Sequence, residues 1–110
     1  MKILKFYESL TDDVKIGDYA LMKIAVYNSF VTSDKIYYKY INTTIGKICN
    51  IRKYNGINIS YENVPYEIKG YFCNNSDGLY ERNFSNDELF EYGKTIEELQ
   101  LKLQTKKFNI

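Results

Sequence analysis

Two short segments of the chain interleave cationic and aromatic side chains. One spans residues 35–40, and the other lies at the end of an expected β-hairpin, at residues 52–54. Cations pair with phosphates or carboxylates, while tyrosine rings stack on bases or pack against protein surfaces. The candidate partner-binding residues are Lys35, Tyr37, Tyr38, Lys39, Tyr40, Arg52, Lys53 and Tyr54.

Three interpretations of these residues stay open. A single-strand nucleic-acid binder needs phosphate contacts and stacking rings together. A protein interface is also rich in tyrosine, because this side chain is large, stiff and amphipathic. In the third interpretation the tyrosines complete the core of a small domain that has twelve Tyr and no Trp. Of the two binding interpretations we favour a protein partner, because a net charge of +1 creates no overall field that would recruit nucleic acid.

No set of residues in the sequence supports catalysis. Histidine is absent, which removes the commonest general base and the most frequent zinc ligand. No nucleophile has an identifiable partner, and no glycine-rich phosphate loop precedes a helix. Cys49 and Cys73 are too far apart in sequence for a close metal-binding pair, and buried thiols are the expected state. We therefore expect no enzyme activity, no catalytic residues, no metal and no cofactor.

Length and composition predict a single domain that spans residues 1–110. The chain is 45% hydrophobic and 26% charged, which is enough apolar material for a core. The basic N-terminus lacks the apolar run of a secretory signal, and no stretch approaches the ~18 apolar residues of a membrane span. We expect a cytoplasmic protein, in the host cell if the gene is viral.

The first half of the chain reads as strands. An apolar run predicts a strand over residues 18–27, because β-branched Ile24 and Val26 outweigh the helix-favouring residues. The helix-favouring residues are Ala20, Leu21, Met22 and Ala25. Residues 35–41 are also rich in strand-forming side chains and are expected to form a hairpin of their own.

The clearest local signal is Asn55-Gly56, which favours a type I′ turn. It predicts a hairpin over residues 45–62, with a bulge near Gly46. The second strand alternates, which places three side chains in the core and three in water. The core set is Ile57, Ile59 and Tyr61, and the water-facing set is Asn58, Ser60 and Glu62.

The later segments are shorter. Pro65 ends the hairpin, and a single helical turn fits before Gly70. Residues 84–92 are ambiguous, since Ser85 and Glu88 fit a capping box for a short helix. We prefer a turn followed by a short closing strand.

A C-terminal helix is expected over residues 95–107. Thr95 is a suitable N-cap and Glu98 stands at the third helical position. A core-facing stripe is predicted at Ile96, Leu99 and Leu103. Leu101 and Phe108 lie off this stripe, so they could seat a second copy of the chain as a homo-oligomer, seat a partner, or lie under the N-terminal strand.

Three features lie in order along residues 14–92. They are Gly17-Asp18-Tyr19-Ala20-Leu21, Ile45-Gly46-Lys47-Ile48, and the Asn-Gly hairpin with a final short strand. Together they resemble the strand order of SH3-like small barrels. The resemblance implies a mainly β (β-rich α+β) fold, either such a barrel or a strongly bent antiparallel sheet, followed by the C-terminal helix. The tyrosine-rich segment departs from the acidic loop and paired Trp of peptide-binding SH3 domains, so a proline-rich ligand is not implied.

Ile, Asn, Lys and Tyr make up 49 of the 110 residues, a bias typical of AT-rich genomes. The chain is similar in this respect to small accessory proteins of phages and other viruses. We therefore expect a non-enzymatic protein-interaction module, encoded by a virus, that binds and inhibits a host protein or defence complex. The alternative is a small barrel that binds single-stranded nucleic acid.

Overall fold

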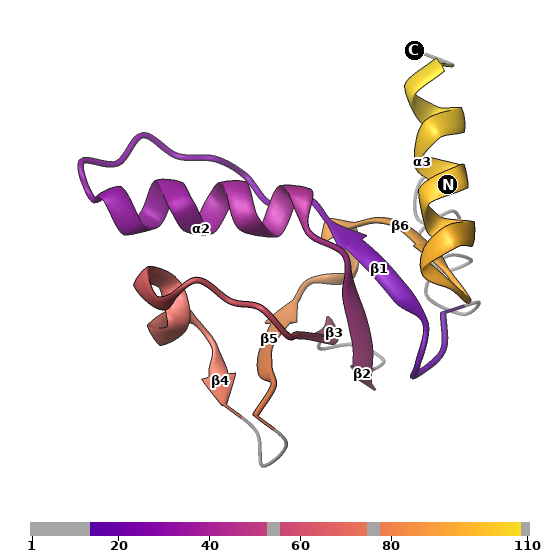
Figure 1. Ribbon diagram of the computed structural model, residues 1–110, viewed down its shortest axis with the longest axis horizontal. Helices are drawn as coiled ribbons and strands as arrows, with labels where there is room; N and C mark the ends of the chain where they lie inside the picture. Colours follow the sequence, from indigo (N-terminus) through magenta and orange to yellow (C-terminus); the bar gives the residue numbers. More distant parts are fainter. Residues whose placement is uncertain (1–13, 53–55, 75–77, 109–110) are drawn as a thin grey trace.

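The computed structural model of the chain describes residues 14–52, 56–74 and 78–108 (Figure 1). Strands and helices are interspersed along this part of the chain, and the two short 3-10 helices carry the label η. The elements are β1 (Tyr19–Met22), α2 (Thr32–Thr43), β2 (Gly46–Arg52), β3 (Gly56–Tyr61), η1 (Tyr66–Tyr71), β4 (Cys73–Asn74), β5 (Tyr80–Phe84), η2 (Asn86–Glu88), β6 (Leu89–Gly93) and α3 (Ile96–Phe108).

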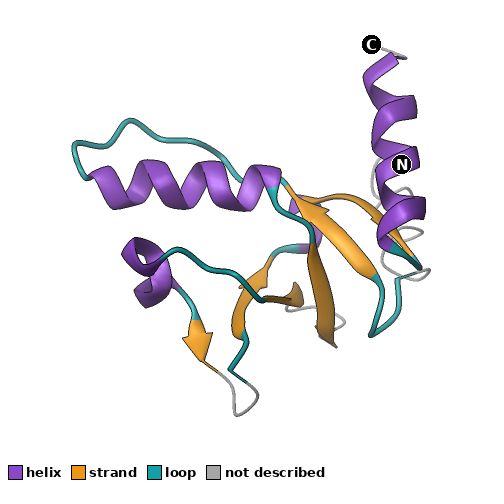
Figure 2. Ribbon diagram, in the orientation of Figure 1, coloured by secondary structure: helices purple, strands orange, loops and turns teal. Residues whose placement is uncertain are grey.

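The strands form one antiparallel sheet in the order β4-β5-β3-β2-β1-β6. Strands β4 and β6 are its edges, so the described strands make an open sheet and do not close into a barrel. Helix α2 and η1 pack on one face of this sheet, while α3 stands beside β6 (Figure 2). The expected antiparallel sheet with a C-terminal helix is confirmed, within an α+β architecture.

The hairpin of β2 and β3 is confirmed, although its turn residues 53–55 lie outside the described residues. Ile57, Ile59 and Tyr61 are buried as predicted. Ser60 is buried as well, and its hydroxyl donates a hydrogen bond to the Lys47 carbonyl at 3.2 Å, so this side chain does not face water. The bulge falls between the paired residues Ile48 and Asn50, later in β2 than predicted.

The strand predicted over residues 35–41 is wrong, because this segment lies in helix α2. Tyr37 and Ile41 stand one helical turn apart and are the two residues that α2 buries, so the apolar pattern fits a helix as well as a strand. The strand predicted over residues 18–27 is also too long. The chain leaves β1 at Lys23, whose backbone N–H donates to the Glu88 carbonyl at 2.8 Å.

The ambiguous segment after Phe84 contains both of its alternatives. Ser85 and Glu88 form the capping box of η2, and the closing strand β6 follows directly. The single helical turn predicted after Pro65 is η1, which continues through Gly70 to Tyr71.

The core lies between the sheet and the layer formed by α2 and η1. Aliphatic side chains of β2, β3, α2 and η1 fill its centre, and a chain of aromatic rings closes one side. The Tyr61 ring contacts the rings of Tyr40 and Phe72 at centroid distances of 5.5 and 5.8 Å. Several tyrosines therefore serve as core residues, as the third interpretation of the sequence expected.

Helix α3 is attached through its first turns. Thr95 accepts a hydrogen bond from the Glu98 backbone N–H at 3.0 Å, which confirms the predicted cap. The predicted stripe is only partly buried, since Leu99 is fully buried while Ile96 is 40% exposed. The helix contacts β6 and β1 near its start, and its later residues extend past the sheet (Figure 1).

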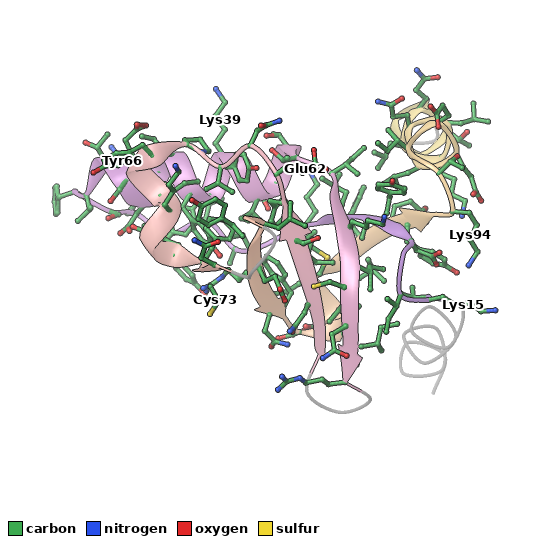
Figure 3. All side chains as sticks on the ribbon, turned by 60° about the horizontal axis from the view of Figure 1, so that its bottom comes forward. Lys15, Lys39, Glu62, Tyr66, Cys73 and Lys94 are labelled. Carbon is green, nitrogen blue, oxygen red and sulfur yellow. The ribbon has the colours of Figure 1, made fainter. Side chains whose placement is uncertain are left out.

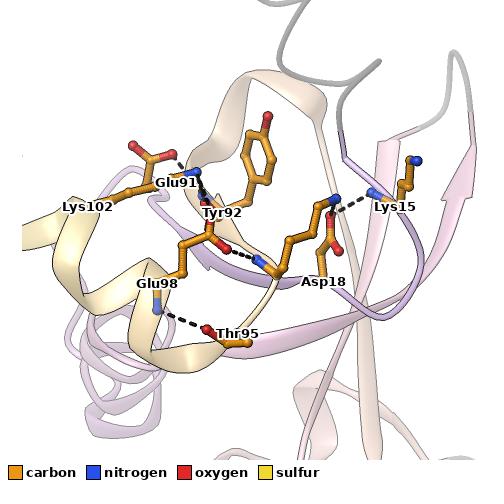
Figure 4. A network of polar contacts seen from close by, with 8 residues as sticks. Lys15, Asp18, Glu91, Tyr92, Thr95, Glu98 and Lys102 are labelled. Carbon is orange, nitrogen blue, oxygen red and sulfur yellow. Dashed lines mark hydrogen bonds and ion pairs between the residues drawn. The ribbon is translucent and has the colours of Figure 1, made fainter.

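Polar contacts fix this junction of α3 with the sheet (Figure 4). The Lys94 ammonium pairs with the buried Asp18 carboxylate at 3.0 Å. Further along the helix, the Lys102 ammonium donates to the Tyr92 carbonyl at 3.0 Å, and the Tyr92 N–H donates to the Glu91 carboxylate at 3.1 Å. Side chains thereby occupy backbone groups of edge strand β6 that would otherwise pair with another strand.

Candidate functional site

The predicted binding residues of α2 differ strongly in exposure. Lys35 and Lys39 are exposed, and Lys39 projects away from the sheet (Figure 3). Tyr38 and Tyr40 are half-buried, and the Tyr40 hydroxyl donates to the Asn63 carbonyl at 3.2 Å. Tyr37 is buried, so most of its ring is not available to a partner.

Tyr37 is instead the centre of a small aromatic stack. Its ring lies on the Tyr71 ring at a centroid distance of 4.7 Å, and the Arg82 guanidinium lies 5.1 Å from the Tyr37 ring centroid. Burial raises the pKa of Tyr37, with smaller and opposing contributions from charged neighbours. We assign Tyr37 to the core.

The two predicted segments do not form one surface. The β2–β3 hairpin runs from the α2 side of the molecule to the opposite side (Figure 3), so Arg52, at the end of β2, lies far from α2. Lys53 and Tyr54 lie outside the described residues.

A feature that the sequence analysis missed is the segment between β1 and α2, residues 23–31, which we call the exposed loop. The side chains of Val26 and Tyr27 are each 68% exposed and that of Phe30 is fully exposed. Val31 also faces solvent. Large apolar side chains clustered on a surface are typical of interaction sites. The signal in the sequence was the apolar run itself, which we interpreted as a strand.

Asn42 holds the first end of the exposed loop. Its side-chain carbonyl accepts the Ile24 backbone N–H at 2.7 Å, and its amide N–H donates to the Ile24 carbonyl at 3.2 Å. The Lys23 ammonium adds a bond to the Asn42 backbone carbonyl at 2.8 Å. The loop is therefore bonded to the last turn of α2.

Asp34 holds the other end. The Ser29 hydroxyl donates to its carboxylate at 2.7 Å, and the Tyr71 hydroxyl donates to the other carboxylate oxygen. The hydrogen bond from Tyr71, and to a smaller extent that from Ser29, holds the pKa of Asp34 below its usual value. The apolar residues of the loop are thus presented between two polar attachments.

A hollow of about 200 Å³ lies beneath the exposed loop, and we call it the Tyr38 hollow. The Tyr27 ring meets the Tyr38 ring edge-on at its wall, with a centroid distance of 6.4 Å. Most of the lining is aliphatic or aromatic. The lining residues are Ile24, Ala25, Tyr27, Tyr37, Tyr38, Arg82, Asn83, Phe84 and Glu88.

A second, larger hollow of about 350 Å³ lies elsewhere, between Tyr19, Tyr40 and the start of β2. Two of its three tyrosine rings already have polar neighbours, since the Tyr40 hydroxyl binds Asn63 and the Lys47 ammonium lies 5.8 Å from the Tyr19 ring centroid. The third ring, that of Tyr61, is buried in the core. Of the large apolar side chains that are exposed in the described part of the chain, only Ile96 contributes to its lining. The Tyr38 hollow is therefore the better candidate site.

The two cysteines are in different environments. The Cys49 thiol is half-buried and donates to the Glu81 carboxylate at 3.2 Å, whereas Cys73 is exposed, contrary to the expectation of two buried thiols. Burial and then the neighbouring Glu81 raise the pKa of Cys49 to about 12. Among the described residues, no group of three potential ligands could hold a metal ion.

We expect a thiol-specific disulfide reagent to modify one cysteine of the folded chain at about pH 8. With a pKa of about 12, Cys49 is a thiolate in only about one molecule in ten thousand at that pH, and the thiolate is the reacting form. Absorbance of the released thiolate measures the reaction. Cys73→Ser should abolish the fast phase and Cys49→Ser should leave it intact. The opposite pattern would contradict the assignment.

In the part of the chain that the structure describes, no helix has the length and apolar character needed to cross a membrane. No family model, curated protein or solved structure matches this chain, so its candidate surface is interpreted from its own residues.

Proposed function

We propose that this chain is a non-enzymatic protein-interaction module whose contact surface is the exposed loop together with the Tyr38 hollow. The observation that carries the proposal is the exposure of Val26, Tyr27 and Phe30 on a loop whose two ends are held by hydrogen bonds. A loop ordered before binding loses less conformational entropy on binding. Aromatic and arginine side chains at a hollow are also typical of the residues that dominate binding energy.

The proposal keeps the expectation of a virus-encoded accessory protein. Such a chain would inhibit a host protein or defence complex by covering about 800 Å² of its surface, which needs no catalytic group. From the SH3-like resemblance the proposal retains a small antiparallel scaffold that presents binding side chains. The binding residues move from the hairpin end to the exposed loop and Tyr38.

Phe30→Ser is expected to weaken partner capture by about tenfold or more, because burying a Phe side chain contributes roughly 1.5–3 kcal/mol. The measurement is a pull-down from a host-cell lysate with quantitative mass spectrometry, followed by a titration against the captured protein. Leu101→Ser is the matched control, since Leu101 is 65% exposed on α3, away from the loop. Circular dichroism would verify that both variants are folded. Equal capture by the wild-type chain and Phe30→Ser would exclude the loop as the contact surface.

Single-stranded nucleic-acid binding is the second candidate. Lys35 and Lys39 favour it, because they lie exposed on one face of α2 and neither forms an ion pair with a described carboxylate. This function predicts an affinity for a single-stranded oligonucleotide that falls steeply as salt rises, through release of counterions. A flat salt response would exclude it.

A further inference from the structure

The Tyr38 hollow has the dimensions of a site for one side chain. Its volume of about 200 Å³ is below the roughly 300–1,000 Å³ of sites that enclose small organic ligands. Ile24, Ala25 and Phe84 form apolar parts of its lining, and Tyr27 and Tyr38 add aromatic surface. Such a lining favours a large aliphatic or aromatic group.

Arg82 supplies a cation to this site, whose lining also includes the polar residues Asn83 and Glu88. Its Nη1 donates to the Tyr71 carbonyl at 2.9 Å, and its guanidinium lies over the Tyr37 ring. These contacts hold an exposed arginine in a defined position. Arg82 forms no ion pair with any carboxylate of the described residues. A guanidinium has five N–H donors in a planar fork that matches a carboxylate, so donors remain for a partner.

The acid that lines the hollow, Glu88, has another role. One oxygen of its carboxylate accepts the Ser85 backbone N–H at 2.8 Å in the capping box of η2. The carboxylate therefore helps to hold the turn before β6, and it forms no ion pair with Arg82. A partner's acidic group is favoured beside Arg82 and disfavoured beside Glu88, which gives the site a polarity.

We propose that the Tyr38 hollow accepts one large apolar side chain from an acidic segment of a partner protein, with a carboxylate of that segment binding Arg82. This inference rests on the proposed function and specifies the chemistry of the partner. The apolar residues of the exposed loop would pack beside the inserted side chain. Lys35 and Lys39 would attract the acidic segment at longer range.

A protein segment fits these features better than a membrane surface. A concave site with a directional cation matches a protruding side chain and a single carboxylate, whereas a bilayer offers no projection to fill a hollow. Binding to anionic lipids typically needs four to eight clustered cations. Among the described residues that line the hollow, Arg82 is the only cation, and the acidic Glu88 lines it as well.

The test is selection from a random-peptide display library on the immobilised full chain. Peptides with an aromatic or long aliphatic residue next to Asp or Glu should be enriched. Arg82→Gln should weaken the best such peptide by about tenfold or more, the usual effect of losing a charge-assisted hydrogen bond. Ala25→Phe, at an exposed position of the lining, should fill the hollow and weaken binding to a similar extent.

Arg52→Gln is the matched control, because Arg52 is the other arginine of the chain and lies at the far end of β2. It should bind as the wild type does. The inference would be overturned if the enriched peptides lacked acidic residues, or if Arg82→Gln and Arg52→Gln bound the best peptide equally well. The proposed function would still stand in that case, provided that Phe30→Ser lost partner capture. A third outcome concerns vesicles of equal parts phosphatidylcholine and phosphatidylserine. If the chain bound these vesicles and Phe30→Ser abolished that binding, both the inference and the proposed function would be overturned.

Discussion

Gly56→Ala is expected to lower the free energy of unfolding by about 3 kcal/mol or more. Gly56 begins β3 with a φ of +101°, which alanine adopts only with strain. A Cβ at this position would also overlap the backbone carbonyl of Phe84 on β5. Because this neighbour is backbone, relief requires a shift of β5 against β3, in the centre of the sheet.

Two other glycines separate the effect of backbone strain from the effect of overlap with Phe84. Gly78 has a φ of +79° with open space around an added Cβ, so Gly78→Ala should cost only about 1 kcal/mol. At Gly70, φ is outside the left-handed region and the space is also open, so Gly70→Ala should be neutral or stabilising by up to ~1 kcal/mol. Urea unfolding followed by circular dichroism measures all three. Equal losses for Gly56→Ala and Gly78→Ala would show that contact with Phe84 is unimportant.

Leu99→Ala is expected to destabilise the chain by about 2–5 kcal/mol, the usual range for removing a buried leucine side chain. Leu99 is the one fully buried residue of α3 among those whose side chains are described. Its turn of the helix packs closely on the end of β6, since a Cβ added to Gly93 would lie 2.8 Å from the Leu99 backbone nitrogen. The junction with the sheet therefore depends on this side chain.

Leu101→Ala is the control for this prediction, because Leu101 is largely exposed and its truncation should change stability by less than ~0.5 kcal/mol. Thermal unfolding followed at two wavelengths would also show whether α3 unfolds with the sheet. A cost below about 1 kcal/mol for Leu99→Ala would mean that α3 is an appendage. The sheet would then remain folded without residues 95–110.

The stability variants and the binding variants lie in separate parts of the molecule. Gly56 and Leu99 belong to the sheet and to its junction with α3, whereas Phe30 and Ala25 are exposed on the loop. A loss of binding in Phe30→Ser or Ala25→Phe without a loss of stability would therefore report on the surface itself. Arg82 contacts the aromatic stack of Tyr37 and Tyr71, so Arg82→Gln changes contacts within the fold as well as the binding surface. A loss of binding in this variant is therefore compared with the loss in Ala25→Phe.

The elements that sequence analysis predicted well are those with local signals. Asn55-Gly56 marks the β2–β3 hairpin, and the alternation of Ile57, Ile59 and Tyr61 identifies its buried face. Thr95 and Glu98 mark the start of α3. In each case the information lies within a few residues, where turn geometry and side-chain capping act directly on the backbone.

The candidate site depended on contacts that no local pattern contains. A stretch rich in Tyr and Ile between residues 35 and 41 satisfies a strand as well as a helix, and packing against η1 and the sheet favoured the helix. That choice buried Tyr37 and left Tyr38 beside the exposed loop. Arg82 gives the site its positive charge, but no residue next to it in the sequence indicated a binding role.

The sequence by itself determined an Asn-Gly hairpin, a capped C-terminal helix and an excess of tyrosine. Only the tertiary structure decided which tyrosines are core and which are surface, and that residues 23–31 leave the sheet. The attachments of this loop come from Asn42, 18 residues beyond Ile24, and from Asp34 with Tyr71, 37 residues apart. Hydrogen bonding and burial between residues so distant depend on how the whole chain packs, and local periodicity does not encode them.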